Sequence, residues 1–265
     1  MIRMRSMIAA LITAATLALG TSTSEADPVQ VRYVEGSLHG FLGLRSTDGH
    51  LIASGDLFQT VAADRVTARL VFHFKDGSLS DETAVFSQRD HFTLITDRLV
   101  QRGPAFAHPL EMTIDSSSGA VTVRYTDDHG EEKVEREQMD LPPDLANGLI
   151  TTLLKNLPSS AALPSVSMVA ATPKPRLVKV EITAGGTDTL SIAGTARKAT
   201  HYVLKIDIGG VAGLVAPLVG KKPPDAHVWI LQGDVPAFVK SRSTMFVGGP
   251  LWETLLVSPQ WPKAR

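Results

Sequence analysis

The sequence predicts a mainly β protein in which a curved antiparallel sheet, or partial β-barrel, wraps around one amphipathic helix. Apolar and polar residues alternate in many short segments that end at glycine, proline or aspartate, as in antiparallel strands. One central segment instead has helical periodicity with a continuous apolar face. A single helix between two β arrays buries that face only if one sheet curves around it or two sheets pack on it. The alternative architecture is therefore a β-sandwich.

The 265-residue chain is expected to contain a signal peptide, residues 1–26, and a single β-rich domain, residues 27–265. Arg3 and Arg5 precede an apolar run over residues 7–20, and small residues favour cleavage after Ala26. No later stretch reaches the ~20 apolar residues that cross a bilayer, so no integral membrane segment is expected after cleavage. The chain has no cysteine, which excludes disulfides and an acylated cysteine anchor. These features predict a periplasmic or secreted bacterial protein.

Residues 27–140 are predicted to form a first β meander. Its clearest strand covers residues 66–75, where apolar and polar residues alternate up to the Asp76-Gly77 turn. His73 falls on the polar side of this strand and is expected to face solvent. A strand within residues 29–45 is expected to pair with the next one through a tight turn at Asp48-Gly49. Further strands are expected at residues 83–88, 92–101, 110–115, 120–125 and 133–139.

Residues 141–157 are predicted to form the core helix. The double proline Pro142-Pro143 suits a first turn, where backbone N–H groups have no helical partner, and Pro158 prevents continuation. Asp144 and Lys155 complement the positive and negative ends of the helix dipole. The apolar face is expected to be buried, and it consists of Leu145, Ala146, Leu149, Ile150, Leu153, Leu154 and Leu157.

Residues 158–265 are predicted to form a second β array. Its expected strands are residues 165–170, 176–183, 189–193, 198–208, 226–231, 235–241 and 251–257. For residues 165–170 the alternative is a domain linker, because the surrounding stretch is poor in charge and rich in proline, serine and alanine. Gly185-Gly186 is expected to be the turn between the second and third of these strands.

No catalytic residue, metal site or cofactor is predicted. The chain lacks the common hydrolase, zinc-protease and nucleotide-binding motifs, and its eight histidines have no HxH or HxxxH spacing. Residues 127–132, with sequence DDHGEE, contain four carboxylates, but their spacing fits no calcium loop and predicts a solvated hairpin tip. The net charge of −1 gives no indication of nucleic-acid binding.

Residues 209–224 form an unusually apolar connection, GGVAGLVAPLVGKKPP. One interpretation is a short helix or loop that caps the sheet and completes the core. The other is a lid over an apolar pocket, with two adjacent lysines at an anionic headgroup. The candidate ligand-binding residues are Val211, Leu214, Val215, Leu218, Lys221 and Lys222.

The segments FHFKDG, LPPDLANG and ATHYVLKIDIGGVAGLVAPLVGKKPPDAHVWIL together resemble a set of uncharacterised exported bacterial proteins. The order of meander, helix and second meander also looks like the curved half-barrels of lipoprotein-localisation factors of the LolA and LolB types. That resemblance is architectural. It implies a concave sheet that holds acyl chains, and it carries over no site residue.

Three functions follow as hypotheses. The first is non-enzymatic binding of a lipid or other amphipathic small molecule in the cell envelope, based on the concave sheet and the apolar connection. The second is a hydrolase whose site is assembled from scattered histidines and aspartates. The third is an envelope scaffold or interaction protein, because residues 27–158 contain 12 Lys and Arg against 20 Asp and Glu, whereas residues 159–265 contain 12 against 6.

Overall fold

The computed structural model describes residues 28–158, 165–192, 194–207 and 223–257. These residues form fourteen strands and one short helix, α1 (Ile150–Asn156). The strands are β1 (Leu38–Ser46), β2 (Leu51–Ala62), β3 (Arg65–Phe74), β4 (Leu79–Gln88), β5 (Phe92–Arg102), β6 (Leu110–Asp115), β7 (Ala120–Thr126), β8 (Glu132–Gln138), β9 (Val166–Ala170), β10 (Arg176–Ile192), β11 (Thr195–Asp207), β12 (Ala226–Leu231), β13 (Ala237–Ser243) and β14 (Trp252–Val257).

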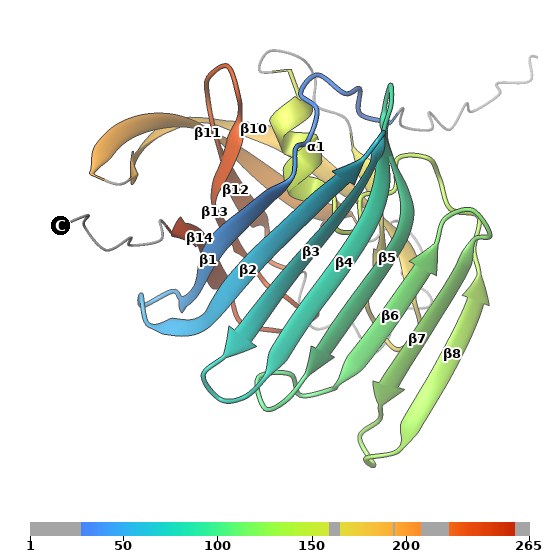
Figure 1. Ribbon diagram of the computed structural model, residues 1–265. Helices are drawn as coiled ribbons and strands as arrows, with labels where there is room; N and C mark the ends of the chain where they lie inside the picture. Colours follow the sequence, from blue (N-terminus) through green and yellow to red (C-terminus); the bar gives the residue numbers. More distant parts are fainter. Residues whose placement is uncertain (1–27, 159–164, 193, 208–222, 258–265) are drawn as a thin grey trace, which may run out of the picture.

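All of these strands belong to one antiparallel sheet, in the order β8-β7-β6-β5-β4-β3-β2-β1-β14-β13-β12-β11-β10-β9. β1 and β14, the first and last strands, pair at the middle of the sheet and join the two meanders. Figure 1 shows the sheet curving so that β1–β8 face β10–β12 across the interior, with α1 between them. The curved sheet is therefore confirmed, and the β-sandwich is not observed.

In most strands, alternation places the apolar side on the concave face, whereas β8 has no buried residue. His73 lies on the other side and is exposed, as predicted, whereas its neighbours Phe72 and Phe74 are buried. Gly185 and Gly186 do not form the predicted turn, because they lie at a bulge within the continuous strand β10. A Cβ on Gly185 would lie 2.7 Å from Nδ1 of His201, so the missing side chain makes room for that ring.

The helix is shorter than the predicted residues 141–157, since α1 has only seven residues. Gly148 adopts a positive φ of 65° and separates α1 from an extended segment before it. The predicted apolar face is nevertheless buried, with Ile150 only partly so. The preceding segment is not helical because the Asp144 carbonyl and the Ala146 amide bond to β9.

That segment, residues 144–147, covers the free edge of β9. Ser167 donates its amide to the carbonyl of Asp144 and accepts from the amide of Ala146. The Asn147 side chain then behaves like one more backbone unit, because its Nδ2 donates to the Val169 carbonyl at 2.9 Å and its Oδ1 accepts from the Val169 amide at 2.8 Å. This edge of the sheet is thereby paired rather than open.

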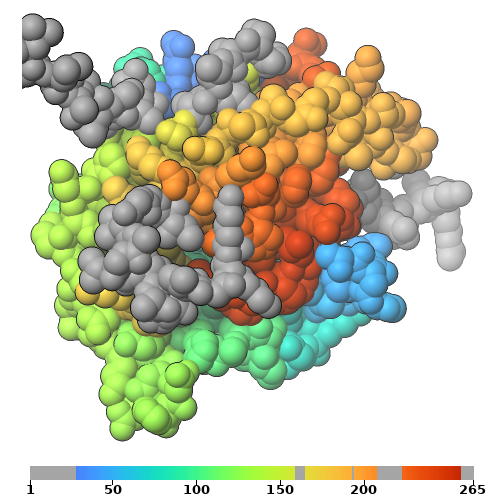
Figure 2. Space-filling view, turned by 180° about the vertical axis from the view of Figure 1, so that it is seen from behind, coloured from blue at the N-terminus to red at the C-terminus, as the bar shows by residue number. Residues whose placement is uncertain are grey.

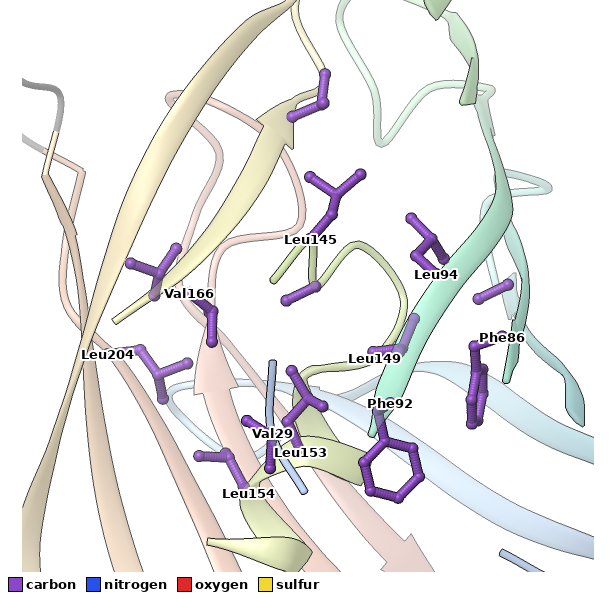
Figure 3. Close-up of a cluster of buried hydrophobic side chains, with 14 of the residues drawn as sticks. Val29, Phe86, Phe92, Leu94, Leu145, Leu149, Leu153, Leu154, Val166 and Leu204 are labelled. Carbon is purple, nitrogen blue, oxygen red and sulfur yellow. The ribbon is translucent and has the colours of Figure 1, made fainter. Parts of the chain in front are cut away.

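The interior contains two apolar clusters. The larger one surrounds α1 and combines Leu149, Leu153 and Leu154 with side chains from β3–β7 and β9–β12. Figure 3 shows these leucines packed among Val29, Phe92 and Leu204, which come from distant parts of the chain. The smaller cluster lies toward the ends of the strands that are farther from α1. It is centred on four aromatic side chains: Phe72, Phe74, Phe106 and Trp252.

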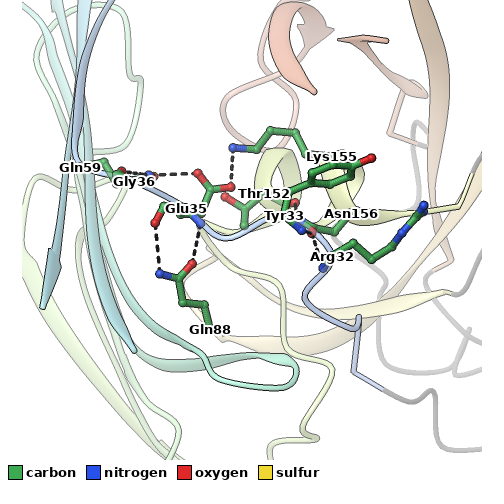
Figure 4. A network of polar contacts seen from close by, with 9 residues as sticks. All are labelled: Arg32, Tyr33, Glu35, Gly36, Gln59, Gln88, Thr152, Lys155 and Asn156. Carbon is green, nitrogen blue, oxygen red and sulfur yellow. Dashed lines mark hydrogen bonds and ion pairs between the residues drawn. The ribbon is translucent and has the colours of Figure 1, made fainter. Parts of the chain in front are cut away.

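Residues 29–36 precede β1, the strand predicted within residues 29–45, and form a strap across the end of the molecule that holds α1. Val29 is buried in the larger cluster, and its carbonyl accepts from the Phe92 amide at 2.9 Å. The Asn156 side chain accepts from the amides of Arg32 and Tyr33 at 2.8 and 2.7 Å (Figure 4). The last residues of α1 thus fix the path of the strap.

Glu35 anchors the other end of the strap. Its carboxylate pairs with Lys155 of α1 at 2.5 Å and accepts from Gln59 of β2 at 3.0 Å. Its backbone exchanges two hydrogen bonds with the side chain of Gln88 on β4 (Figure 4). Glu35 is 8% exposed, so these bonds compensate the desolvation of a buried charge. Alternation within residues 29–45 gave no indication of this network.

Leu149→Asp is expected to lower the free energy of unfolding by about 4 kcal/mol or more, because it buries a carboxylate in the larger cluster. This corresponds to a fall of roughly 10 °C in melting temperature for a domain of this size. Val235→Asp is the control, since Val235 is 79% exposed and its replacement should change the melting temperature little. Equal melting temperatures for wild type and Leu149→Asp would contradict the assignment of this helix to the core.

Asn147→Leu is expected to cost about 2–3 kcal/mol, because it leaves the buried amide and carbonyl of Val169 without partners. Hydrogen exchange checks this directly. The Val169 amide should exchange much faster in the variant, whereas the Leu70 amide on β3 should keep the protection that global stability allows. Unchanged protection at Val169 would show that Asn147 does not pair this edge.

Candidate functional site

An interior cavity of about 930 Å³ lies between the two apolar clusters. Its walls come from β3–β6 on one side and from β9–β11 on the other, and Asn147 adds the covered edge of β9. Most of the lining is apolar, and it includes Leu70, Phe72, Leu99, Met112, Met168, Val178, Val180 and Ile206. Figure 2 shows the molecule from behind, where the orange and red strands of the second array lie between the yellow-green strands and the light-blue turn after β1.

The loop between β13 and β14, residues 244–249, forms one end wall of the cavity. Gln101 of β5 donates from Nε2 to the Met245 carbonyl at 2.8 Å, which links the loop to the opposite half of the sheet. The Phe246 ring packs on Phe106 and Trp252, with centroid distances of 5.5 and 6.2 Å. The loop is therefore held by the smaller cluster.

Two acidic side chains, Glu82 of β4 and Asp97 of β5, face the interior. Glu82 lines the cavity, and Asp97 is 2% exposed. Both approach Gly148, because a Cβ built on Gly148 would lie 3.1 Å from Oδ1 of Asp97 and 3.7 Å from Oε1 of Glu82. Neither oxygen of Asp97 accepts a hydrogen bond of ordinary geometry. The two carboxyl groups thus converge beneath Gly148, two residues before α1.

The cross-strand neighbours of both carboxyl groups are apolar. Glu82 lies opposite Leu70 and Leu99. Asp97 lies opposite Ala84 and Ile114. Paired sheet positions are the nearest side-chain neighbours on one face, so neither carboxyl group meets a donor there.

A bulge turns Asp97 inward. Val85 pairs with Thr96 and Phe86 pairs with Leu94, so one extra residue, Ile95, stands in β5 between them. If the strand kept Ile95 but had no bulge, the phase set by the buried residues Phe92 and Leu94 would place Thr96 and Arg98 inside and Asp97 outside. The sequence alternation alone therefore hides this acidic residue. Glu82 was detectable, because it shares the phase of Ala84 and Phe86, but the expected strand began one residue after it.

Burial raises the pKa of both acids. The pKa of Glu82 rises from 4.5 to about 6 because its charged form loses hydration. The pKa of Asp97 lies well above its ordinary value, first because of burial and then because of the Glu82 charge, and the Arg98 amide offsets this only in part. The pair therefore retains a proton to higher pH than two isolated carboxyl groups would.

A second polar cluster lies on the outer face of β10–β12, opposite the buried side chains of Tyr202 and Leu204. Nε2 of His201 lies 2.9 Å from Nδ1 of His227, and the His201 ring stacks on Trp229 at 4.5 Å. Asp188 accepts from the Trp229 indole at 2.7 Å.

Burial, His201 and then Arg242 lower the pKa of His227. Within the described ranges, no serine or threonine hydroxyl is hydrogen-bonded to His201 or His227. This cluster of two imidazoles and a carboxylate lies outside the cavity.

Acidic side chains of the hairpin tip between β7 and β8 bond to other groups of the same tip. Oδ1 of Asp127 accepts from the amides of His129 and Glu131, both at 2.9 Å, and Lys133 pairs with Glu131 at 2.5 Å. In the part of the chain with described positions, no group of three or more acidic or histidine residues is arranged to hold a metal ion. Nor does any helix there have the length and apolarity to span a bilayer.

The predicted ligand-binding residues Val211, Leu214, Val215, Leu218, Lys221 and Lys222 lie outside the described residues, as does the predicted signal peptide. The lining described above is made of other residues. None of these lining residues was predicted as a site from the sequence. A cavity forms where the curvature of the sheet keeps inward side chains too far apart to touch, and the sequence alone does not give that curvature.

Comparison with known proteins identifies no family. No family model matches the chain, and no curated protein matches it. A solved structure, the beta-barrel-like protein of the domain of unknown function DUF1849 from Brucella abortus, is similar over 85% of this chain and 98% of that one. The identity is 9% and the TM-score is 0.46. This likeness gives no activity.

Glu82→Gln is expected to stabilise the protein at about pH 7.5 but not at about pH 4. The folded state holds the Glu82 proton more tightly than the unfolded chain, so ionisation between pH 4.5 and about 6 removes stability from the wild type. The variant escapes this loss and should gain about 2 kcal/mol over wild type at the higher pH. Urea unfolding at both pH values measures the difference.

Glu132→Gln on the exposed edge strand β8 is the control for this experiment and should show no such pH-dependent gain. A Glu82→Gln difference that is the same at both pH values would contradict the raised pKa.

Proposed function

We propose that the protein is an exported carrier that binds one amphipathic, lipid-like molecule in the interior cavity. The observation that carries the proposal is the cavity itself. Its volume of about 930 Å³ is at the upper end of the range in which small-molecule sites are found, roughly 300–1,000 Å³. A mostly apolar wall with a few polar groups at one place matches a ligand with an apolar body and one polar end.

The surroundings of the cavity support a built site rather than a packing fault. Interiors normally fill their space at crystal-like density, and an empty apolar volume costs stability. Here Gln101 holds the end wall and Asn147 holds the β9 side, each through specific hydrogen bonds. The walls are therefore fixed independently of any content.

Export is the less direct half of the proposal and rests on the leader-like sequence of residues 1–26. An exported carrier for an apolar molecule also agrees with the resemblance to lipoprotein-localisation half-barrels. Organic extraction of protein purified from a bacterial envelope, followed by mass spectrometry, would identify a stoichiometric occupant.

Val178→Trp is expected to weaken binding of the fluorescent apolar probe N-phenyl-1-naphthylamine by about tenfold or more, ~1.4 kcal/mol, because the indole fills part of the cavity. Leu177→Trp is the matched control. Leu177 precedes Val178 on β10 but is exposed on the other face, so the same side chain there should leave binding unchanged.

Thermal unfolding of both variants accompanies the titration, and both are expected to melt within a few degrees of wild type because each indole has room. If the wild type binds no probe, or if both tryptophans weaken binding equally, the cavity is not the binding site and the proposal fails.

A further inference from the structure

We infer that Glu82 and Asp97 together bind an ammonium headgroup, so that the ligand is a cationic amphiphile with its apolar chain in the cavity. This inference rests on the proposed function and adds the chemistry of the headgroup. Two features carry it: the two carboxyl groups converge on one point beneath Gly148, and Glu82 borders the cavity. Asp97 lies behind Glu82, at the diagonal position of the β4–β5 pair, so its charge adds to that of Glu82 at the cavity wall.

Among the described residues, the pair receives no hydrogen bond of ordinary geometry. Buried carboxyl oxygens are normally hydrogen-bonded, yet both oxygens of Asp97 have no partner of ordinary geometry. The neighbours across the sheet are alanine, leucine and isoleucine, as described above. Folding has therefore placed two strong acceptors in an apolar wall, and a ligand with several N–H donors would satisfy them.

The charge of the pair favours a cation over a neutral donor. Burial is the one cause that raises the pKa of Glu82, so no cation within the described residues offsets it. Arg176 also lines the cavity, but it has other interactions and does not contribute to the pKa of either acid. Asp144, in the segment that covers the pair, forms an ion pair with Lys179 at 3.3 Å. A charge in a medium of low dielectric attracts a counter-ion far more strongly than in water.

The position of the pair sets the orientation of the ligand. Leu70, Leu99 and Met112 line the cavity next to Glu82, so an alkyl chain attached to the ammonium group lies against apolar side chains from β3, β5 and β6. Gly148 is part of the arrangement because any Cβ there would lie 2.5 Å from the Ala84 side chain and 3.1 Å from Oδ1 of Asp97.

The test compares three ligands of equal chain length: decylammonium, decanol and decanoate, each below its micelle concentration. Their binding to the full chain is measured at pH 7.5 by displacement of N-phenyl-1-naphthylamine and by calorimetry. Decylammonium should bind at least about tenfold more tightly than decanol, the size of effect expected from one partly desolvated charge pair.

The double variant Glu82→Gln/Asp97→Asn should bind decanol as the wild type does and lose the preference for decylammonium. Glu111→Gln, an outward-facing change on β6 that removes a partner of Arg98, is the matched control and should keep the preference. If the double variant fails to fold, the wild type still provides a test through pH. Its preference should fall several-fold near pH 5, where Glu82 is largely protonated and decylammonium remains charged.

The outcomes separate the inference from the proposed function. Equal binding of decanol and decylammonium, or tighter binding of decanoate through Arg176, would overturn the ammonium site and leave a lipid-binding cavity in place. A preference that does not change between pH 7.5 and pH 5 would also overturn it. Absence of binding by all three ligands and by the probe would instead reject the proposed function itself.

Discussion

The hydrogen bonds between residues 144–147 and β9 are the constraint on which the rest of the structure depends. A sheet of fourteen strands that does not close on itself leaves two edges, and the segment with Asn147 pairs one of them. The other edge, β8, is instead exposed and rich in charge. The pairing at β9 also positions Gly148 over the acidic pair and starts α1 in the larger cluster. One short extended segment therefore ends the sheet, orients the helix and supplies part of the cavity wall.

The cavity exists because the curved sheet encloses more space than the helix and the inward side chains fill. Barrels of about eight strands are filled by their own side chains, whereas a larger curved sheet encloses more space than they occupy. A helix of the predicted length would have extended much further through that space than the seven residues of α1. Because residues 144–147 are taken up by β9, the helical filling is confined to one end. The aromatic cluster fills the other end, and the volume between them remains.

The sequence predicted the features that depend on local alternation, and it missed those that depend on partners far along the chain. The strand 66–75, the exposed His73 and the buried leucine face were all predicted, because each is fixed by a period of two or 3.6 residues. The strap, the pairing of Asn147 and the true start of the helix were not, because each needs a partner whose position only the fold determines. The acidic pair was hidden partly by the bulge in β5 and partly by the boundary assigned to β4.

The bulge in β5 decides which side chains of that strand face the interior. The bulge at Ile95 shifts the in-and-out alternation of all later residues of β5 by one position. The inward orientation of Asp97 and Gln101 therefore depends on the number of residues in the strand as well as on their types. A loss of one residue between the bulge and Asp97 would present Arg98 and Val100 to the interior in place of Asp97, Leu99 and Gln101, and it would free the end wall at Met245. A loss of Ile95 itself would instead remove the bulge and leave Asp97 inward. Substitutions in this stretch alter one wall position each, whereas a one-residue deletion after the bulge exchanges the whole wall of the strand. Variation in length is therefore a shorter route than point mutation to a different ligand on this scaffold.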